Sequence, residues 1–301
     1  MKIIFCAEPF TATVPDSAYT DEVAAARSVG FETALIDFEA LVHDGNVRAA
    51  LRRVAPVEEP TLALYRGWML RPAIYAELYD ALRERGLTLI NDPAAYKHCH
   101  YFPESYPIIA PFTPHTVTIP VPPNFTVADV FPLLTSFGER PLIVKDYVKS
   151  RKHEWYEACF IPQANDHAAV TRVIERFLEL QGADLNEGLV LREFVELQPL
   201  GEHTQSGMPL TQEFRLWFVD GIRFASSQYW DEGTYTSTVP PDNLFSEVAQ
   251  NVQSRFFTMD VAQKCDGTWI IVELGDGQVA GLPETVNVAA FYQTLYTALA
   301  L

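Results

Sequence analysis

Short apolar runs alternate with amphipathic stretches over the first hundred residues of the chain. Apolar residues that recur every three or four positions are typical of helices, and short apolar runs between turn residues are typical of buried strands. The pattern predicts helices over Asp21–Val29 and Arg71–Arg85, ended by Gly30 and Gly86. Strands are predicted over Ile3–Ala7, Phe31–Asp37, Thr61–Tyr65 and Leu87–Ile90. This order predicts a small doubly wound α/β lobe.

Polar side chains follow three of these predicted strands. They are Glu8, Arg66 and Asn91. In sheets of this kind ligands bind beyond the carboxyl ends of the strands. These positions therefore mark one edge at which a substrate could bind.

The pattern changes after a Pro-rich stretch from Pro103 to Pro123, which predicts a boundary or an extended linker. Strands over Leu142–Tyr147, Trp155–Ile161 and Leu189–Val195 and a helix over Asp166–Leu180 are predicted next. Two hairpins with Asp-Gly turns and a helix from about Val286 complete the pattern. We therefore expect three regions, covering residues 1–112, 113–190 and 191–301.

The composition is that of an ordinary globular protein, but its charge is strongly negative. The 39 acidic residues outnumber the 22 Lys and Arg residues, and the formal net charge is −17. Such a surface repels nucleic acids and anionic membranes, so neither is an expected partner. An anionic ligand would have to bind in a local basic pocket.

The four cysteines, Cys6, Cys99, Cys159 and Cys265, are scattered and form no Cys-x-x-Cys pair. Scattered thiols favour a reducing, cytoplasmic setting. No apolar run has the length of a membrane span, and the first residues are typical of a strand rather than a signal peptide.

The hairpin around Asp266-Gly267 carries the clearest chemical signal. If these two residues form the turn, counting outward places Asp260 directly opposite Glu273. Opposed carboxylates repel, and a Mg²⁺ ion between them would turn that repulsion into coordination. Asp276 could add a third oxygen. The alternative is that both carboxylates face solvent, or that the turn is longer and the register shifts.

A second hairpin turns at Asp220-Gly221, and the same counting places Arg215 opposite Ser226 and Glu213 opposite Gln228. Arg215 shares its strand face with apolar residues, so its guanidinium needs a partner there. A phosphate group is one candidate, because the planar guanidinium binds it through two hydrogen bonds. A salt bridge with Glu213 or another carboxylate is an equally good interpretation.

The predicted strand Leu142–Tyr147 contains a single cation, Lys145, and a basic segment follows it. Lys149, Arg151 and Lys152 make this segment the densest positive cluster in an acidic chain, which favours a polyanionic ligand. The segment lacks the glycines of a P-loop. We expect the loop over residues 148–154 to be mobile and to become ordered over a bound nucleotide. The alternative for Lys145 is an edge-strand lysine that discourages aggregation.

Two further motifs carry weaker signals. The apolar strand that ends in Arg192-Glu193-Phe194-Val195 could offer backbone groups to an adenine ring. His98-Cys99-His100 is too closely spaced for all three side chains to hold one metal ion from regular structure.

Taken in order, these motifs resemble the ATP-grasp superfamily, and more narrowly its clade marked by two arginines and one lysine in the nucleotide site. The resemblance implies an α+β fold with an amino-terminal α/β pre-ATP-grasp lobe, a central lid and a carboxyl-terminal subdomain. It implies ATP and Mg²⁺ as cofactors. Its implied nucleotide-site residues are Lys145, Lys149, Lys152, Arg192, Glu193, Phe194, Val195 and Arg215, with Lys145 and Arg215 also catalytic.

The resemblance also implies that Asp260 and Glu273 hold Mg²⁺ and that Arg66 and Asn91 border the substrate. ATP-grasp enzymes usually end the metal motif with Glu-x-Asn, whereas this chain has Gly275 at the Asn position, so Asp276 is the expected substitute. The implied activity is ligation of a carboxylate to an amine or similar nucleophile through an acyl phosphate, on a small-molecule or peptide substrate. The alternatives are a phosphotransferase on the same fold and a nucleotide-binding module without catalysis.

Overall fold

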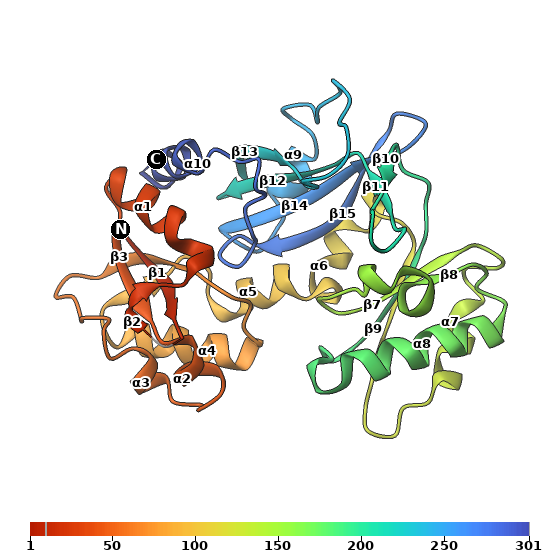
Figure 1. Ribbon diagram of the computed structural model, residues 1–301, viewed down its shortest axis with the longest axis horizontal. Coiled ribbons are helices and arrows are strands. Elements are labelled where there is room, and N and C mark those ends of the chain that lie inside the picture. Colours follow the sequence, from red (N-terminus) through yellow and green to blue (C-terminus); the bar gives the residue numbers. More distant parts are fainter. Residues whose placement is uncertain (10, 301) are drawn as a thin grey trace.

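The computed structural model describes residues 1–9 and 11–300. Three sheets lie around two consecutive helices, α5 (Pro93–His100) and α6 (Phe102–Ile109), at the centre of the molecule (Figure 1). The amino-terminal lobe lies on one side of these helices and the middle lobe on the other (Figure 1). The carboxyl-terminal sheet spans the space above both.

The amino-terminal sheet is mainly parallel, in the order β3-β1-β4-β5, with β2 paired antiparallel to the end of β1. Its elements are β1 (Lys2–Glu8), β2 (Thr11–Pro15), α1 (Thr20–Ser28), β3 (Glu32–Ile36), α2 (Phe38–Val42), α3 (Val47–Ala50), β4 (Thr61–Arg66), α4 (Pro72–Arg83) and β5 (Leu87–Leu89). The strands and helices predicted for this lobe are therefore present, with ends shifted by one or two residues. β2, α2, α3 and α5 were not predicted.

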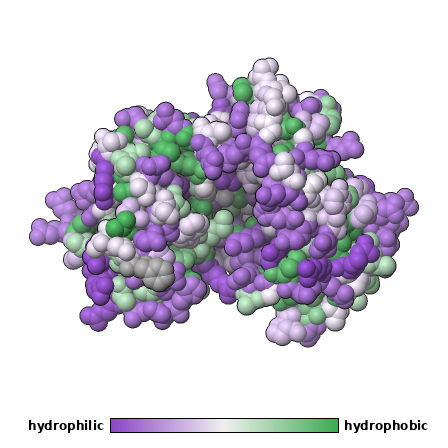
Figure 2. Space-filling view, in the orientation of Figure 1, coloured by the Kyte–Doolittle hydropathy of each residue, from purple (hydrophilic) through white to green (hydrophobic). Residues whose placement is uncertain are grey.

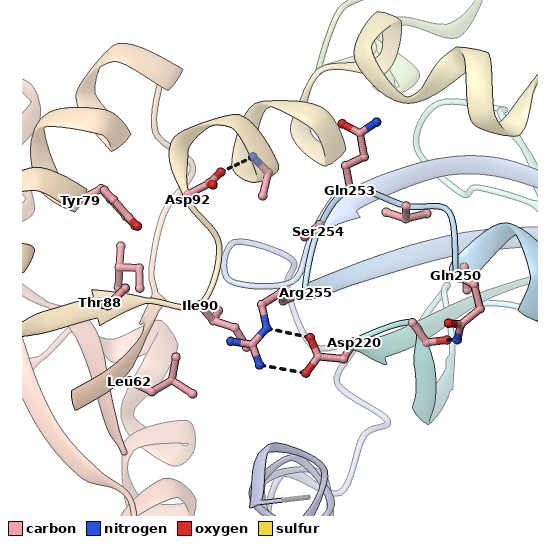
Figure 3. Close-up of a pocket in the computed structure, with 15 residues that line it drawn as sticks. Leu62, Tyr79, Thr88, Ile90, Asp92, Asp220, Gln250, Gln253, Ser254 and Arg255 are labelled. Carbon is pink, nitrogen blue, oxygen red and sulfur yellow. Dashed lines mark hydrogen bonds and ion pairs between the residues drawn. The ribbon is translucent and has the colours of Figure 1, made fainter. Parts of the chain in front are cut away.

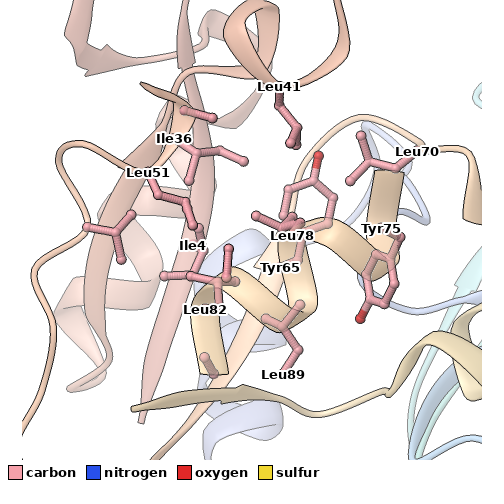
Figure 4. Close-up of a cluster of buried hydrophobic side chains, with 14 of the residues drawn as sticks. Ile4, Ile36, Leu41, Leu51, Tyr65, Leu70, Tyr75, Leu78, Leu82 and Leu89 are labelled. Carbon is pink, nitrogen blue, oxygen red and sulfur yellow. The ribbon is translucent and has the colours of Figure 1, made fainter. Parts of the chain in front are cut away.

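The alternation of side chains along β1 gives the lobe two apolar layers. Ile4 and Cys6 pack with α4 in one core cluster, which is drawn in Figure 4. Ile3 and Phe5 pack on the other face, against α1 and the terminal helix α10 (Val288–Ala300). The last helix of the chain thus completes the first lobe, and the two lie side by side in Figure 1.

The middle sheet is antiparallel, in the order β6-β9-β7-β8, and is covered by α8. Its elements are β6 (Thr116–Pro120), α7 (Phe131–Leu134), β7 (Leu142–Asp146), β8 (Phe160–Ile161), α8 (His167–Gln181) and β9 (Gly188–Glu193). The boundary expected between the second and third regions, at residues 190 and 191, falls inside β9. This strand belongs entirely to the middle sheet. The lobe therefore continues to residue 193.

Two features of this region differ from the prediction. Of the two interpretations of residues 103–123, a boundary or an extended linker, the linker is wrong, because α6 and β6 occupy most of these residues. Pro103 stands in the first turn of α6, where a missing N–H costs nothing. The strand predicted over Trp155–Ile161 is a π-helical turn, Trp155–Cys159, followed by only two strand residues. Trp155, Ala158 and Cys159 are buried at helical spacing, while Tyr156 and Glu157 between them are exposed.

The carboxyl-terminal sheet is antiparallel, in the order β13-β12-β14-β15. Its strands are β12 (Glu213–Val219), β13 (Ile222–Gln228), β14 (Phe256–Gln263) and β15 (Trp269–Asp276). A small sheet of β10 (Pro199–Glu202) and β11 (Pro209–Thr211) and the short helix α9 (Ser246–Ala249) flank it. Met259, Phe257 and Leu216 on its inner face pack against α6.

The residue pairing in both hairpins differs from the pairing predicted by counting outward from a two-residue turn. Asp260 does pair with Glu273, but the turn is one residue longer than predicted and a bulge after Asp260 restores the register. In the other hairpin the Asp220-Gly221 turn is as predicted, yet a bulge between Trp217 and Phe218 moves Arg215 opposite Ser227 instead of Ser226. The same bulge leaves Gln228 opposite Phe214 and not Glu213. Bulges shift register without a sequence signal that counting can detect.

Within the described residues, no helix combines the length and the apolar character needed to cross a membrane.

Candidate active site

An apolar cavity of about 460 Å³ lies between the middle sheet and the carboxyl-terminal sheet. We call it the apolar cavity. Its walls come from the end of β9 and the segment after it, from the π-helical turn and from strands β11 and β15. Aromatic and aliphatic side chains form most of the lining, among them Trp155, Phe194, Met208, Ile270 and Val272. A flat apolar group such as a purine base would be desolvated on both faces there.

Residues 192–196 form one wall, and Arg192–Val195 of this segment were predicted to offer backbone groups to an adenine ring. Glu193 is held by Arg140 at 2.8 Å, and the Phe194 amide donates to the Pro141 carbonyl at 2.8 Å. Among the described residues, the amides of Val195 and Glu196 have no hydrogen-bond partner. Unpaired backbone groups beside an apolar cavity are suited to hydrogen bonds with a ligand.

Two ion pairs stand at the inner end of this region, in a narrow cavity of about 90 Å³ lined by all four charged groups. Lys145 of β7 reaches across to Glu273 of β15, with Nζ and Oε2 2.5 Å apart. Arg215 of β12 binds Asp260 of β14 through two hydrogen bonds of 2.8 Å each. Three consecutive strands of one sheet and one strand of another therefore converge on this point.

The register of the carboxyl-terminal sheet brings three members of the two ion pairs together. Arg215, Asp260 and Glu273 occupy directly paired positions on β12, β14 and β15, so their side chains leave the sheet on the same face. Burial would raise the pKa of Glu273, but Lys145, Lys152 and Arg192 outweigh burial and lower that pKa to about 2. Burial would lower the pKa of Arg215, and Asp260 raises it instead. Glu273 and Arg215 are therefore both charged at neutral pH.

Arg192 of β9 lies between the two cavities and is only 4% exposed. Its guanidinium lies 5.2 Å from the ring centre of Phe102 and donates to the Thr113 hydroxyl and, at 3.2 Å, to the Ile271 carbonyl. Its Nε has no partner among the described residues. Burial lowers its pKa to about 10. A buried guanidinium with an unused donor and no carboxylate partner is suited to an anionic ligand.

The basic segment after β7 is divided between two places. Lys152 lines the apolar cavity, with its ammonium 5.1 Å and 4.9 Å from the ring centres of Tyr229 and Trp230. Arg151 is turned away and donates to the Leu180 carbonyl at the end of α8. Lys149 does not line the apolar cavity. Ordering of this loop over a nucleotide stays a prediction.

Sequence reasoning missed three aromatic residues of the site. Tyr229 stacks on the Arg215 guanidinium at 5.0 Å, Trp230 covers Lys152, and Phe102 lies under both Lys145 and Arg192. The only available signal was the position of Tyr229-Trp230 directly after the hairpin strand that ends near Glu213. Phe102 reaches the site only through the packing of α6.

Glu213 is a buried carboxylate at the border of the apolar cavity. It forms no ion pair among the described residues, although Arg215 and Lys152 are nearby in sequence or space. The salt bridge considered as the alternative for Arg215 is thus present, but its partner is the other nearby carboxylate, Asp260, and not Glu213. Burial raises its pKa to about 7.

A Glu213→Gln variant should therefore show a distinct pH dependence of stability. Between pH 4.5 and about 7 the unfolded chain ionises Glu213 while the folded protein keeps it protonated, so the wild type loses stability as pH rises through this range. The amide cannot ionise. We expect the variant to gain roughly 3 kcal/mol in free energy of unfolding relative to wild type from pH 4.5 to pH 8. Urea titrations at both pH values measure the change, and equal differences at both would contradict it. The exposed Glu157→Gln is the control.

Arg66 and Asn91, expected at the substrate side, lie away from both cavities. Arg66 is 1% exposed, forms an ion pair with Glu22 at 2.7 Å and donates to the carbonyls of residues 277, 278 and 280. Asn91 is fully buried and bonds with the backbone of residues 255 and 256 and with Asp276. Both side chains join the amino-terminal lobe to the carboxyl-terminal sheet, and their hydrogen-bonding groups are occupied.

Asp276 differs from the other two expected metal ligands. It is fully buried and accepts hydrogen bonds from Asn91 at 2.6 Å and from the backbone and side chain of Gln278. Burial raises its pKa to about 7. An Asn at position 275 would require Thr258 to shift, because its Cβ would lie 2.6 Å from the Thr258 hydroxyl oxygen. Asp276 lines the narrow cavity together with Asp260 and Glu273, but its oxygens already accept the hydrogen bonds described above, so it is poorly suited to be a third ligand in this structure.

Asp260 and Glu273 remain as the carboxylates that would hold a Mg²⁺ ion. Among the described residues, no three His, Cys, Asp or Glu side chains gather closely enough to bind a metal by themselves. Asp260 and Glu273, which line one cavity, nevertheless fit Mg²⁺, because this ion usually takes one or two carboxylates and completes its shell with phosphate oxygens and water.

A further cavity of about 530 Å³ lies between the amino-terminal lobe and α9 (Figure 3). We call it the rear cavity. Its charged pair, Asp220 and Arg255, is joined by hydrogen bonds of 2.7 and 2.9 Å, drawn in the figure. None of the residues predicted for the site lines it. The converging cations of the narrow cavity, and not the size of a cavity, thus mark the candidate site.

Comparison with solved structures shows the same fold over the whole chain. D-cycloserine synthetase DcsG is 14% identical, with a TM-score of 0.59 over 99% of this chain and 100% of that one. An ATP-grasp RimK domain protein from Sphaerobacter thermophilus is also 14% identical, with a TM-score of 0.59 over 99% and 97%. The D-alanine-D-alanine ligase from Coxiella burnetii is 10% identical, with a TM-score of 0.57 over 99% and 93%.

No similar chain was found among curated protein sequences. A family model described as "ATP-grasp domain, R2K clade family 3" matches residues 136–295, slightly more than half of the chain. The matched segment contains Lys145, Arg192, Arg215, Asp260 and Glu273. The chain therefore belongs to family 3 of the R2K clade of ATP-grasp domains.

Proposed function

We propose that this protein binds ATP with Mg²⁺ between the middle and carboxyl-terminal sheets and uses it to activate a substrate carboxylate as an acyl phosphate, which an amine then attacks. One observation carries the proposal. Lys145, Arg215, Asp260 and Glu273 line one narrow cavity beside a large apolar one, with Arg192 between them. An apolar site for a base next to a charged site for phosphates is the pairing that a nucleotide requires.

The residues divide the work by position. The apolar cavity would take the adenine ring against Trp155 and Phe194, with hydrogen bonds from the backbone of residues 195 and 196. Lys145, Lys152 and Arg192 would bind the phosphates, and charge-assisted hydrogen bonds of this kind are the strong ones. Asp260 and Glu273 would hold Mg²⁺. When bound, the metal neutralises negative charge on the transferred phosphoryl group.

The two ion pairs neutralise part of the charge in the site and leave an excess of cations. Four cations, Lys145, Lys152, Arg192 and Arg215, stand beside three carboxylic groups, Glu213, Asp260 and Glu273. Arg215 and Lys145 satisfy the two metal-binding carboxylates through ion pairs. On ligand binding both cations would turn to phosphate oxygens.

Similar proteins make the ligase interpretation reasonable. The ATP-grasp ligase PsnB has been solved with a minimal precursor, Mg and ADP, and shares the fold at 13% identity and a TM-score of 0.53. D-cycloserine synthetase and D-alanine-D-alanine ligase are named for products that contain a newly formed amide or amide-like bond. These likenesses support ligation as the reaction class and leave the substrate to experiment.

Hydroxylamine trapping tests the proposal. The protein is incubated with Mg·ATP, hydroxylamine and a panel of amino acids, N-acyl amino acids and short peptides. A ligase is expected to release ADP and form a hydroxamate, because hydroxylamine attacks the acyl phosphate. A phosphotransferase would release ADP and form a phosphorylated product without hydroxamate, which would contradict the proposal. The same assay with the Asp220→Asn variant, altered outside the cleft, controls for indirect effects.

A further inference from the structure

The narrow cavity opens into a second space on the side away from the apolar cavity. This space, which we call the side cavity, has a volume of about 300 Å³. Met69, His100 and Val148 line both it and the narrow cavity, so the two are adjoining. The apolar cavity, the narrow cavity and the side cavity thus form a series, with Lys145 and Glu273 between the outer two. Figure 2 shows the hollow between the amino-terminal and middle lobes on this face of the molecule.

The side cavity combines apolar walls with cations that have no acidic partner. Val42, Leu70 and Ile74 of the amino-terminal lobe form the apolar part. Arg71, at the start of α4, and Lys149, after β7, provide the charges from opposite lobes. Among the described residues neither forms an ion pair, in a chain whose net charge is −17. The Arg71 guanidinium donates a single hydrogen bond, of 2.6 Å, to the Ala183 carbonyl and keeps its other donors.

We propose that the side cavity binds the amine substrate by that substrate's own carboxylate, and that this substrate is an apolar α-amino acid or a short peptide ending in one. The inference rests on the proposed ligase function and adds to it the class of acceptor. Arg71 and Lys149 are placed to bind the carboxylate, and Val42, Leu70 and Ile74 to contact the apolar side chain. The amine would then point past His100 toward the narrow cavity.

Three features support this occupant. A volume of about 300 Å³ is at the lower end for ligand pockets and suits one or two amino-acid residues. Asp184 also lines the cavity and can accept from an ammonium or amide N–H. His100 stands at the junction with the narrow cavity, and burial, with Lys149 and Lys145 adding to it, lowers its pKa to about 4. A neutral imidazole can accept a hydrogen bond from an amine.

The placement also gives the two lysines of the basic segment different tasks. Lys152 lines the apolar cavity and Lys149 the side cavity, although only two residues separate them. The basic segment would therefore contact both the nucleotide and the acceptor. Binding of both substrates would order this segment.

Ligand-observed NMR titration tests the inference by binding, without requiring turnover. The probes are leucine, methionine and phenylalanine in L and D forms and the dipeptide alanyl-leucine, each beside its primary amide, with and without AMP-PNP and Mg²⁺. At least one acid is expected to bind, with its amide at least about tenfold weaker, because a charge-assisted contact contributes more than one neutral hydrogen bond. An Arg71→Met/Lys149→Met variant should bind that acid at least about tenfold more weakly.

The control is Arg48→Met/Arg172→Met, which removes the same charge from two exposed residues that line none of these cavities and should bind like wild type. Arg71→Lys/Lys149→Arg keeps the charge and should bind within about threefold of wild type, which separates lost charge from lost folding. Binding of no probe, equal binding of acids and amides, or full affinity in the Met variant would each overturn the inference. AMP-PNP binding without acid binding refutes only this inference, whereas acid binding without hydroxamate formation refutes only the ligase proposal.

Discussion

Replacement of Glu273 by Gln is expected to lower kcat by about a thousandfold, the size of effect seen when a preorganised electrostatic contact is removed from an active site. Glu273 lines the narrow cavity and is one of the two carboxylates that would hold Mg²⁺. The amide keeps the shape of the side chain and removes its charge. Steady-state ADP release with the trapped substrate measures the effect, and a loss of less than tenfold would contradict the assignment.

The same substitution has a separate effect on stability. It leaves the Lys145 ammonium, whose side chain is 7% exposed, without its partner at 2.5 Å. Removing one member of a buried ion pair costs about 3–5 kcal/mol in free energy of unfolding. Lys145→Met/Glu273→Gln removes both charges and should recover much of that loss while remaining inactive. Asp220→Asn, which breaks the exposed Asp220–Arg255 pair of similar length on the same sheet, should change stability by about 1 kcal/mol or less and leave kcat unchanged.

Replacement of Lys145 by Met is expected to weaken ATP binding by about 10- to 150-fold. Charge-assisted hydrogen bonds to buried groups contribute about 1.5–3 kcal/mol, and each 1.4 kcal/mol is a factor of ten in affinity. The variant also leaves Glu273 without its cation, so an uncompensated carboxylate would face the phosphates. Isothermal titration with AMP-PNP and Mg²⁺ measures the change.

Two controls make this measurement specific. Lys264→Met removes a half-buried lysine that follows β14 and is paired with Asp266 at 3.1 Å, and it should leave nucleotide affinity unchanged. The Lys145→Met variant should bind adenosine with the same affinity as the wild type, because the base would bind in the apolar cavity and not near Lys145. Unchanged affinity for AMP-PNP in Lys145→Met would show that this lysine serves only to neutralise Glu273.

The strands and helices with a clear period were predictable from the chain alone. β1, β4, α4, α8 and β9 have apolar positions at the period of their structure, and local preference and burial agree there. The residues that converge on the site were predictable too, because Lys145, Arg192, Arg215, Asp260 and Glu273 are charges within or at the end of apolar strands. A charge in that setting requires a partner wherever the strand lies.

Other local features were misread because two patterns fit the same residues. Trp155, Ala158 and Cys159 satisfy a helical turn as well as a short irregular strand, and only their burial distinguishes the two. Prolines suggested a linker at residues 103–123, yet Pro103 stands where a helix tolerates proline. The Asp260–Glu273 pair was predicted correctly although the turn was miscounted, since the longer turn and the bulge cancel.

The sequence by itself predicted five of the charged side chains that meet at the candidate site, and the strands that hold them. Only the tertiary structure decided which partner each would meet. Lys145 meets Glu273 across two sheets and 128 residues, and Arg66 is occupied by Glu22 instead of facing a substrate. Lys149 and Lys152, neighbours in the chain, line different cavities. Strand preferences are local, whereas these partnerships depend on how three lobes pack around α5 and α6, and no short-range pattern encodes that packing.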